Sequence, residues 1–241
     1  ANNAFEASAE ADRFAVTKLV FREDRRYQEA ARLLNPSKAP VADCVPEPEW
    51  TDADLLDAQK EIVQLVSFRT LSTPAGRGML LFSGRMPLLT EKLPIPSFSL
   101  QCVMKPSNVT VSAERSAFTE EKVCWAFFHN GVSTGLAITK ESKGIDTSWI
   151  LFNKPPDLTN RHAGFLLALG LNGHLKNLAK WVAFTYLTPK HTMTSIGLLL
   201  GLSASYLGTM DTLITRLLSV HVSRMLPMGA AELNLSPLTQ T

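Results

Sequence analysis

Two stretches in the last third of the chain are apolar on nearly every side and carry small residues at matching positions. The first runs from Ala163 to Gly170 and the second from Ile196 to Ser203, so the two lie 33 residues apart. Leucine fills most of the positions between the small residues. A helix that is apolar all round is typical of an inner layer that other helices cover. The pattern therefore predicts two deeply buried helices.

The small residues in these stretches favour close helix packing. Glycine inside a helix costs about 1 kcal/mol relative to alanine, so its recurrence needs a compensating reason. Small residues at i and i+4 form a flat strip that lets a neighbouring helix approach closely. Each stretch is followed by a turn glycine and by a more amphipathic helix, expected at about 175–187 and 210–225. The repeat positions are Gly164, Ala168, Gly170, Gly173, Gly197, Gly201, Ser203 and Gly208.

One helical hairpin per unit, at a period of about 20 to 50 residues, is the signature of a solenoid. The alternative is two unrelated buried helices that share leucine through composition. The segment 157–160 before the first stretch is similar to 237–240 at the end of the chain, which suggests a third unit and a segment cut from a longer array. The paired prolines Pro155 and Pro156 mark a boundary. We therefore divide the chain into a leading region, 1–156, and two repeats, 157–241.

The leading region is predicted to be mostly helical. Asp24 is placed to cap a helix that ends at Asn35, because the residue before a proline avoids the helical region. Thr51 and Asp54 have the spacing of a capping box and start a helix that ends near Leu71. A further helix is expected from about Thr119.

A small β element is predicted between these helices. Strand-forming residues occur at 79–82, 98–104 and 109–111, bounded by glycine, proline and asparagine. The short run 136–139 has the same character. The fold class predicted for the whole chain is mainly α: a helical-repeat segment, of solenoid or toroid type, preceded by a helical region with a small β element.

Composition excludes several classes of function. The chain has 241 residues, 45% of them hydrophobic, and a formal net charge of +2, which gives no electrostatic case for binding nucleic acid or an anionic membrane. The apolar stretches 162–171 and 195–207 are shorter than the roughly 20 residues of a membrane span. Three widely spaced cysteines, Cys44, Cys102 and Cys124, favour a reducing, intracellular compartment.

Two patterns in the chain resemble catalytic motifs. Gly131–Gly135 spells G-x-S-x-G with Ser133 in the centre, but a hydrolase elbow needs a strand before the serine and a helix after it. The predicted order here is the reverse, which favours a glycine-rich turn. Cys124 and His129 are five residues apart on a predicted helix and point in different directions, so a buried cysteine is favoured over a nucleophile. We predict that the chain is not an enzyme.

Cofactor and metal patterns are also weak. The five histidines form neither an H-E-x-x-H motif nor an i, i+4 pair with another ligand type. Gly76-Arg77-Gly78 begins like a nucleotide fingerprint, but Leu81 stands where its third glycine belongs. We expect no cofactor, no metal and no small-molecule substrate.

Three sites have the sequence that proline-directed kinases modify: Thr73-Pro74, Thr188-Pro189 and Ser236-Pro237. Ordinary loop chemistry is the alternative at each. Thr73 is the best candidate, because 71–78 is predicted to be an exposed turn.

Asn160–Leu171 and Thr192–Leu202 resemble the proteasome/cyclosome repeat family, in which a glycine- and leucine-rich inner helix is followed by a small turn and an outer helix. This repeat occurs in the two large non-ATPase subunits of the proteasome base and in the largest subunit of the anaphase-promoting complex. The present residues are more similar to the latter, and Tyr27–Leu34 resembles the segment that leads into its array. The repeats cover about a third of the chain.

The resemblance implies a non-catalytic scaffold in a multi-subunit RING-type ubiquitin ligase that times mitosis. It implies contacts with a cullin and RING module, with helical-repeat subunits and with coactivators, in the nucleus and cytoplasm. The alternative that it leaves open is a scaffold or receptor of the proteasome base that binds ubiquitin-like domains.

Overall fold

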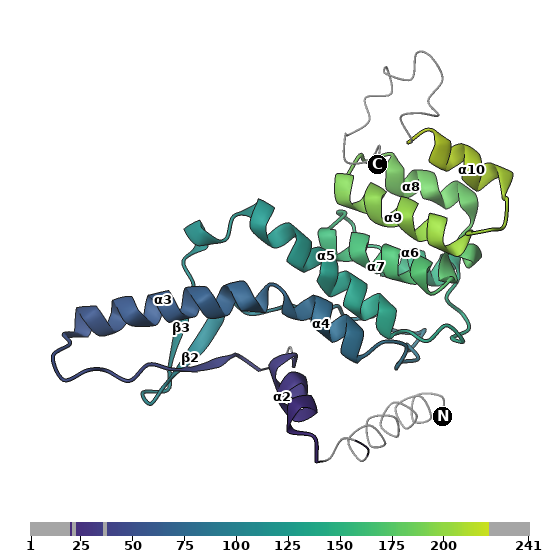
Figure 1. Ribbon diagram of the computed structural model, residues 1–241. Coiled ribbons are helices and arrows are strands. Elements are labelled where there is room, and N and C mark those ends of the chain that lie inside the picture. The colour runs from purple at the N-terminus through teal and green to yellow at the C-terminus, as the bar shows by residue number, and fades with distance from the viewer. Residues whose placement is uncertain (1–19, 21–22, 36–37, 222–241) are drawn as a thin grey trace.

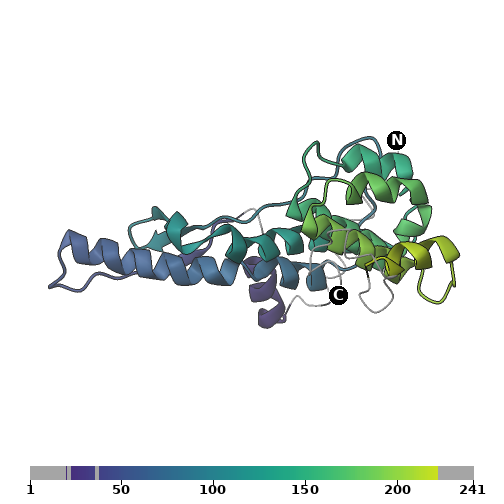
Figure 2. The same cartoon turned by 90° about the horizontal axis from the view of Figure 1, so that it is seen from above.

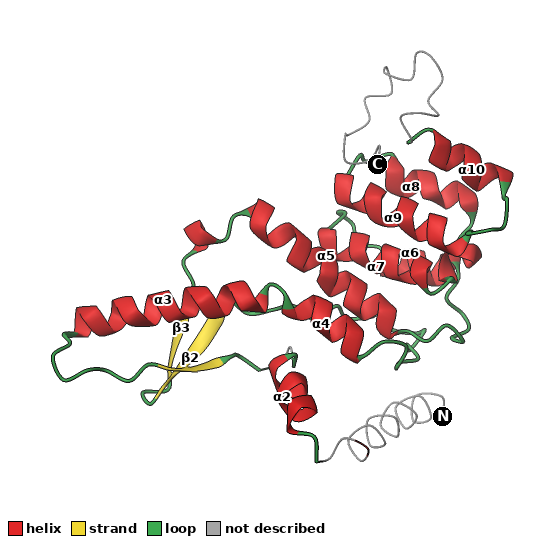
Figure 3. Ribbon diagram, in the orientation of Figure 1, coloured by secondary structure: helices red, strands yellow, loops and turns green. Residues whose placement is uncertain are grey.

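The computed structural model describes residues 20, 23–35 and 38–221, and these are mainly helical with a three-stranded sheet (Figure 3). The molecule is elongated in the view of Figure 2, with a long helix at one end and the C-terminal helices at the other. The predicted fold class, mainly α with a small β element, is confirmed.

The first described helix, α2 (Arg25–Leu33), begins where its cap predicts. The Asp24 carboxylate accepts hydrogen bonds from the backbone N–H groups of Arg26 and Tyr27. These contacts satisfy two of the donors that a helix start leaves free.

The longest helix, α3 (Asp52–Thr70), starts with the predicted capping box. The Thr51 N–H donates to the Asp54 carboxylate at 2.8 Å, and the Asp54 N–H donates to the Thr51 hydroxyl at 3.3 Å. The helix ends at Thr70, with Leu71 as its C-cap.

The sheet packs against α3. It comprises β1 (Val41–Asp43), β2 (Gln101–Lys105) and β3 (Val109–Ser112), with β1 parallel and β3 antiparallel to the central β2. Two of the predicted strands, at 98–104 and 109–111, correspond to β2 and β3. Strand β1 was missed, because three residues among prolines carry no alternation to detect. A small core lies between the sheet and α3, and its buried members are Cys44, Val63, Cys102 and Met104.

The strand predicted at 79–82 is wrong. Thr73–Leu80 forms a helix, α4, with a proline in its first turn, where a missing N–H costs nothing. The apolar run at its end packs on one side only, and Met79 remains 85% exposed.

Helix α5 (Glu120–Ala137) starts as predicted but is longer than expected. It continues through Gly131–Gly135, which was predicted to be a turn, and includes the first half of the strand predicted at 136–139. The only pairing left there, among the described residues, is an isolated bridge between Arg85 and Ile138.

The C-terminal third contains the two predicted inner helices, α7 (Asn160–Leu171) and α9 (Thr192–Ser205), whose N-caps are Thr159 and His191. The outer elements are α6 (Thr147–Asn153), α8 (Ala183–Leu187) and α10 (Thr212–Ser219). Short 3-10 turns complete the described helical elements, at Arg115–Ala117, His174–Asn177 and Lys180–Val182.

The outer helix predicted at 175–187 is not continuous. Leu178 is extended between two 3-10 turns, and only Ala183–Leu187 is α-helical. Groups in this segment bond to the preceding unit instead of to a helix: the Asn177 amide donates to the Ile145 carbonyl, and the Ala179 N–H donates to the Thr147 hydroxyl. The second outer helix is present as α10 but is shorter than the predicted 210–225, since it begins at Thr212 and ends at Ser219; residues 222–225 lie outside the described residues.

Three inner helices, α5, α7 and α9, lie side by side in chain order (Figure 1). The contacts of α5 with α7 and of α7 with α9 are the most extensive between described elements. The main core forms between these helices and the outer layer, and its largest fully buried members include Phe165, Leu166, Leu169, Leu198 and Tyr186. The division at residue 156 remains a prediction, and α5 packs across it.

Replacing Gly164 with alanine is expected to destabilise the chain by about 3 kcal/mol. The new methyl group would collide with the Phe128 carbonyl oxygen on α5, and backbone gives way less readily than a flexible side chain. Chemical unfolding of the two proteins measures the difference. Gly84→Ala is the matched control, because a methyl group there meets only the Leu81 carbonyl oxygen at 3.4 Å. Equal stability of both variants would contradict the close packing.

Candidate functional site

The first contact between inner helices joins α5 to α7 through a reciprocal pair of glycines. A methyl group on Gly131 would overlap the Arg161 carbonyl oxygen, and one on Gly164 would overlap the Phe128 carbonyl oxygen. Backbone of each helix therefore fills the space that a side chain would need on the other. Gly164 therefore lies where the backbones of α5 and α7 approach most closely.

The second contact, between α7 and α9, repeats this geometry. A methyl group on Gly197 would overlap the Ala163 carbonyl oxygen, and one on Gly170 would overlap the backbone of Gly201. We call the set of small residues at these two contacts the glycine spine; its members are Gly131, Gly135, Gly164, Ala168, Gly170, Gly197 and Gly201.

Sequence analysis missed the first two members of the glycine spine. Gly131 and Gly135 lie 33 residues before Gly164 and Ala168, the same offset that separates α7 from α9. The 33-residue offset was visible in the sequence, but Gly131–Gly135 spells G-x-S-x-G and was interpreted as a turn. Three equivalent inner helices are therefore present where two were predicted.

The remaining predicted repeat positions have different roles. Gly173 and Gly208 follow α7 and α9 with φ of +83° and +74°, a conformation that favours glycine. Both were predicted as turn glycines, and their backbone angles agree. Ser203 is partly buried on α9, and its hydroxyl donates to the Leu199 carbonyl of the same helix.

Side-chain hydrogen bonds also join neighbouring units at equivalent positions. The Asn172 amide donates to the Ile138 carbonyl at 2.8 Å, and the Ser205 hydroxyl donates to the Gly170 carbonyl at 2.7 Å. Asn172 and Ser205 are again 33 residues apart. Each binds a carbonyl at or just after the end of the preceding inner helix, where the last carbonyls have no partner four residues later in the helix.

A buried polar pair holds the outer layer against α7. The His162 ring nitrogen Nε2 and the Tyr186 hydroxyl are 3.3 Å apart, and the two rings are stacked. Burial, with a smaller contribution from the Lys154 charge, lowers the pKa of His162 to about 4. Burial also raises the pKa of Tyr186. Both groups are therefore neutral at physiological pH.

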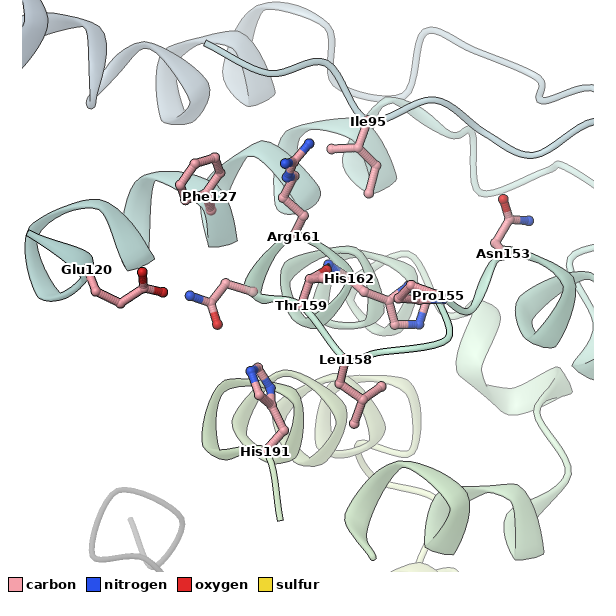
Figure 4. Close-up of a pocket in the computed structure, with 11 residues that line it drawn as sticks. Ile95, Glu120, Phe127, Asn153, Pro155, Leu158, Thr159, Arg161, His162 and His191 are labelled. Carbon is pink, nitrogen blue, oxygen red and sulfur yellow. The ribbon is translucent and has the colours of Figure 1, made fainter. Parts of the chain in front are cut away.

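A pocket of about 510 Å³ lies where α7 and α9 begin (Figure 4). Arg161 and His162 reach it from α7, His191 from the start of α9, and Glu120 from the start of α5. The Arg161 guanidinium lies 5.1 Å from the centre of the Phe127 ring, a cation–π distance. The lining combines a cation, a carboxylate and apolar side chains.

The catalytic patterns do not form catalytic geometry. Ser133 lies inside α5, is 6% exposed, and donates its hydroxyl to the Asn130 carbonyl. A nucleophile elbow requires an exposed serine on a strained strand-to-helix turn. The Cys124 thiol donates to the Glu121 carbonyl, and the His129 ring packs edge-on against Phe128.

The other candidate groups are placed as follows. In the part of the chain that the structure describes, no three His, Cys, Asp or Glu side chains are arranged to hold a metal ion. None of the helices described is both long and apolar enough to cross a bilayer. Gly76-Arg77-Gly78 lies within α4, where Arg77 is buried.

The phosphorylation candidates differ in exposure. The exposed turn predicted around Thr73 is wrong: Thr73 is the first residue of α4, partly buried, and its hydroxyl donates to the Thr70 carbonyl. Thr188 is exposed, with its hydroxyl on the Phe184 carbonyl. Ser236 lies outside the described residues. Modification at all three remains a prediction.

The repeated inner helices and their backbone contacts define a helical-repeat protein, the class in which each unit is covered by its neighbours. A family model described as the fourth domain of APC1 matches residues 16–207, and the chain belongs to this family.

Named relatives agree with the family. The chain is 85% identical over 239 residues to a protein of Emericella nidulans named "Negative regulator of mitosis", covering 99% of this chain and 12% of the relative. It is 50% identical over 228 residues to anaphase-promoting complex subunit 1 of Schizosaccharomyces pombe, covering 94% of this chain and 15% of the relative. The chain is also 44% identical over 223 residues to anaphase-promoting complex subunit 1 of Homo sapiens, covering 91% of this chain and 11% of the relative. The chain thus spans a small part of these relatives.

The stability of the chain is expected to fall as pH is lowered from about 6.5 to about 4. Unfolded His162 takes up a proton near pH 6.5, whereas the folded residue resists protonation until about pH 4. Protonation therefore favours the unfolded state in this interval, by up to roughly 3 kcal/mol. Denaturant unfolding at several pH values measures the slope. His162→Gln should flatten it more than His191→Gln, and equal slopes would count against the buried neutral ring.

Proposed function

We propose that this chain is a non-catalytic scaffold segment of the anaphase-promoting complex, a RING-type ubiquitin ligase that controls mitotic progression. The glycine spine carries the proposal, because it commits the inner helices of the described chain to packing against one another. The names of the relatives, a negative regulator of mitosis and subunits 1 of this complex, support the cellular role.

The proposal assigns ubiquitin chemistry to other subunits of the complex. The partners proposed for the complete protein are a cullin and RING module, helical-repeat subunits and coactivators. Nucleic acid, membranes and small-molecule substrates are not proposed as partners, in keeping with a formal net charge of +2. The proposed location is the nucleus and cytoplasm.

The proteasome base was the alternative left open by the repeat family. The matching family model is described as the fourth domain of APC1, and the fission yeast and human relatives are named subunit 1 of the anaphase-promoting complex, which favours the ligase over the proteasome.

We further propose that another repeat unit covers the outward face of α9. The face of α7 that receives α9 includes Ala163, Leu167 and Gly170. The residues 33 positions later have no such cover within the described chain, and Leu200 is 52% exposed. These equivalent residues on α9 are Ile196, Leu200 and Ser203.

Leu200→Asp is expected to affect the complete protein much more than this chain. In the isolated chain Leu200 is half exposed, so the change should cost less than about 0.5 kcal/mol. Beneath a further repeat the carboxylate would be buried without a partner, at a cost of several kcal/mol. Thermal unfolding of the isolated chain and of the complete protein, each with and without Leu200→Asp, measures the difference in destabilisation.

Leu167→Asp is the matched control, because Leu167 occupies the equivalent place on α7 and already contacts α9. Leu167→Asp should destabilise the isolated chain and the complete protein alike. If Leu200→Asp is equally mild in both, no unit packs on this face.

Affinity capture of the complete protein from mitotic extract tests the scaffold role. We expect mass spectrometry to recover a cullin-like subunit, a RING subunit and helical-repeat subunits together. Recovery of proteasome subunits instead would move the function to the proteasome base. Gly164→Ala, which disrupts the glycine spine, should lower recovery of the whole set, whereas Gly84→Ala should not.

A further inference from the structure

The two edge strands of the sheet, β1 and β3, differ in how well they are protected. β1 is three residues long, includes the charged Asp43 and directly follows Pro40. Very short strands, charged side chains and proline are common protections of an edge strand against pairing with further polypeptide. β3 is longer and has neither a charge nor a proline. The sheet therefore has one protected edge and one unprotected edge.

The free side of β3 presents backbone groups that have no hydrogen-bond partner among the described residues. The Ala113 N–H donates to the Leu100 carbonyl at 2.9 Å, and hydrogen-bonded pairs alternate along an antiparallel ladder. In this register the N–H and C=O of Val111 point toward β2. Those of Thr110 and Ser112 point away from the sheet, and both residues are exposed. Such a row of unpaired groups is a template for another strand.

The side chains of β3 that face α3 are also incompletely covered. Met104 on β2 and Val109 on β3 lie opposite each other in the register, so their side chains are on the same face of the sheet. Met104 is fully buried in the small core between the sheet and α3, whereas Val109 is 50% exposed. Val111 lies on the same face and is only partly buried. The cover of this face is therefore complete at β2 and incomplete at β3.

We propose that a further strand pairs with the free edge of β3, and that the complete protein supplies this strand from residues outside the present chain. Its backbone would bond to the N–H and C=O groups of Thr110 and Ser112. Its side chains are expected to alternate, because every second residue of a strand faces the same side. Those on the α3 side would be apolar and would cover Val109 and Val111, and those on the other side would be polar.

The source of the strand is argued from the sizes of the proteins. The chain covers 12% of the Emericella nidulans relative and 15% of the Schizosaccharomyces pombe relative, so most of the polypeptide in such proteins lies outside the matched segment. β3 has only four residues, so pairing with it forms few hydrogen bonds. A covalently joined segment has a high effective concentration at this short edge, which a separate protein lacks. The proposal is independent of the scaffold role, because it depends on the sheet and not on the glycine spine.

Hydrogen–deuterium exchange of backbone amides, resolved to single residues by mass spectrometry, tests the proposal. It is measured in the 241-residue chain and in the complete protein purified without other proteins. In the 241-residue chain, Thr110 and Ser112 should exchange at nearly the intrinsic rate, while Val111, bonded to β2, should be protected. In the complete protein, Thr110 and Ser112 should exchange at least about a hundredfold more slowly.

A matched pair of proline variants tests which edge receives the strand. Thr110→Pro removes an N–H from the free side of β3, a position where proline breaks no bond to β2. In the complete protein it should abolish the slow exchange of Ser112, while Val111 stays protected and shows that the sheet is folded. Val41→Pro removes an N–H from the free side of β1. It should leave the exchange of Ser112 within about twofold of the unmodified protein.

Three outcomes would overturn the proposal. Equally fast exchange of Thr110 and Ser112 in both proteins would show that the edge of β3 stays open. Slow exchange that appears only after other proteins are added would assign the edge to a separate partner. Slow exchange already present in the 241-residue chain would assign the strand to this chain or, if it depends on protein concentration, to a second copy.

Discussion

The architecture depends on the approach of backbone to backbone at the glycine spine. Where α5, α7 and α9 meet, carbonyl oxygens occupy the space that side chains would need. Around the spine, the leucines of α7 and α9 pack against the outer layer and form the main core with it. The energetic cost of glycine in a helix is offset by the packing that its absence of a side chain permits.

Much of the fold was predictable because its signals are local. The caps at Asp24 and Thr51 and the start of α5 each follow from a few neighbouring residues, and α7 and α9 each carry their own run of leucine and small residues. Predictions of local structure failed where a segment packs against residues far along the chain. Gly131–Gly135 looks like a turn by itself, but it is helical and packs against α7.

The candidate site was only partly predictable for the same reason. The repeat positions followed from the 33-residue offset, and their close contacts agree with it. The outer segment after Gly173 is broken because Asn177 and Ala179 bond to the preceding unit, an arrangement that no local pattern records. The buried pair of Arg77 and Asn130 joins residues 53 positions apart, and neither stands out in its own sequence context.

The fixed spacing of the glycine spine also limits how such a chain can change in length during evolution. Contacts between backbones tolerate no slippage, so an insertion within an inner helix would move every later glycine out of place. The turn glycines Gly173 and Gly208 are 35 residues apart although the spine glycines keep to 33. The two additional residues have accumulated between the spine and the turn of the second unit, and we expect length differences between family members to concentrate in the loops and the outer layer.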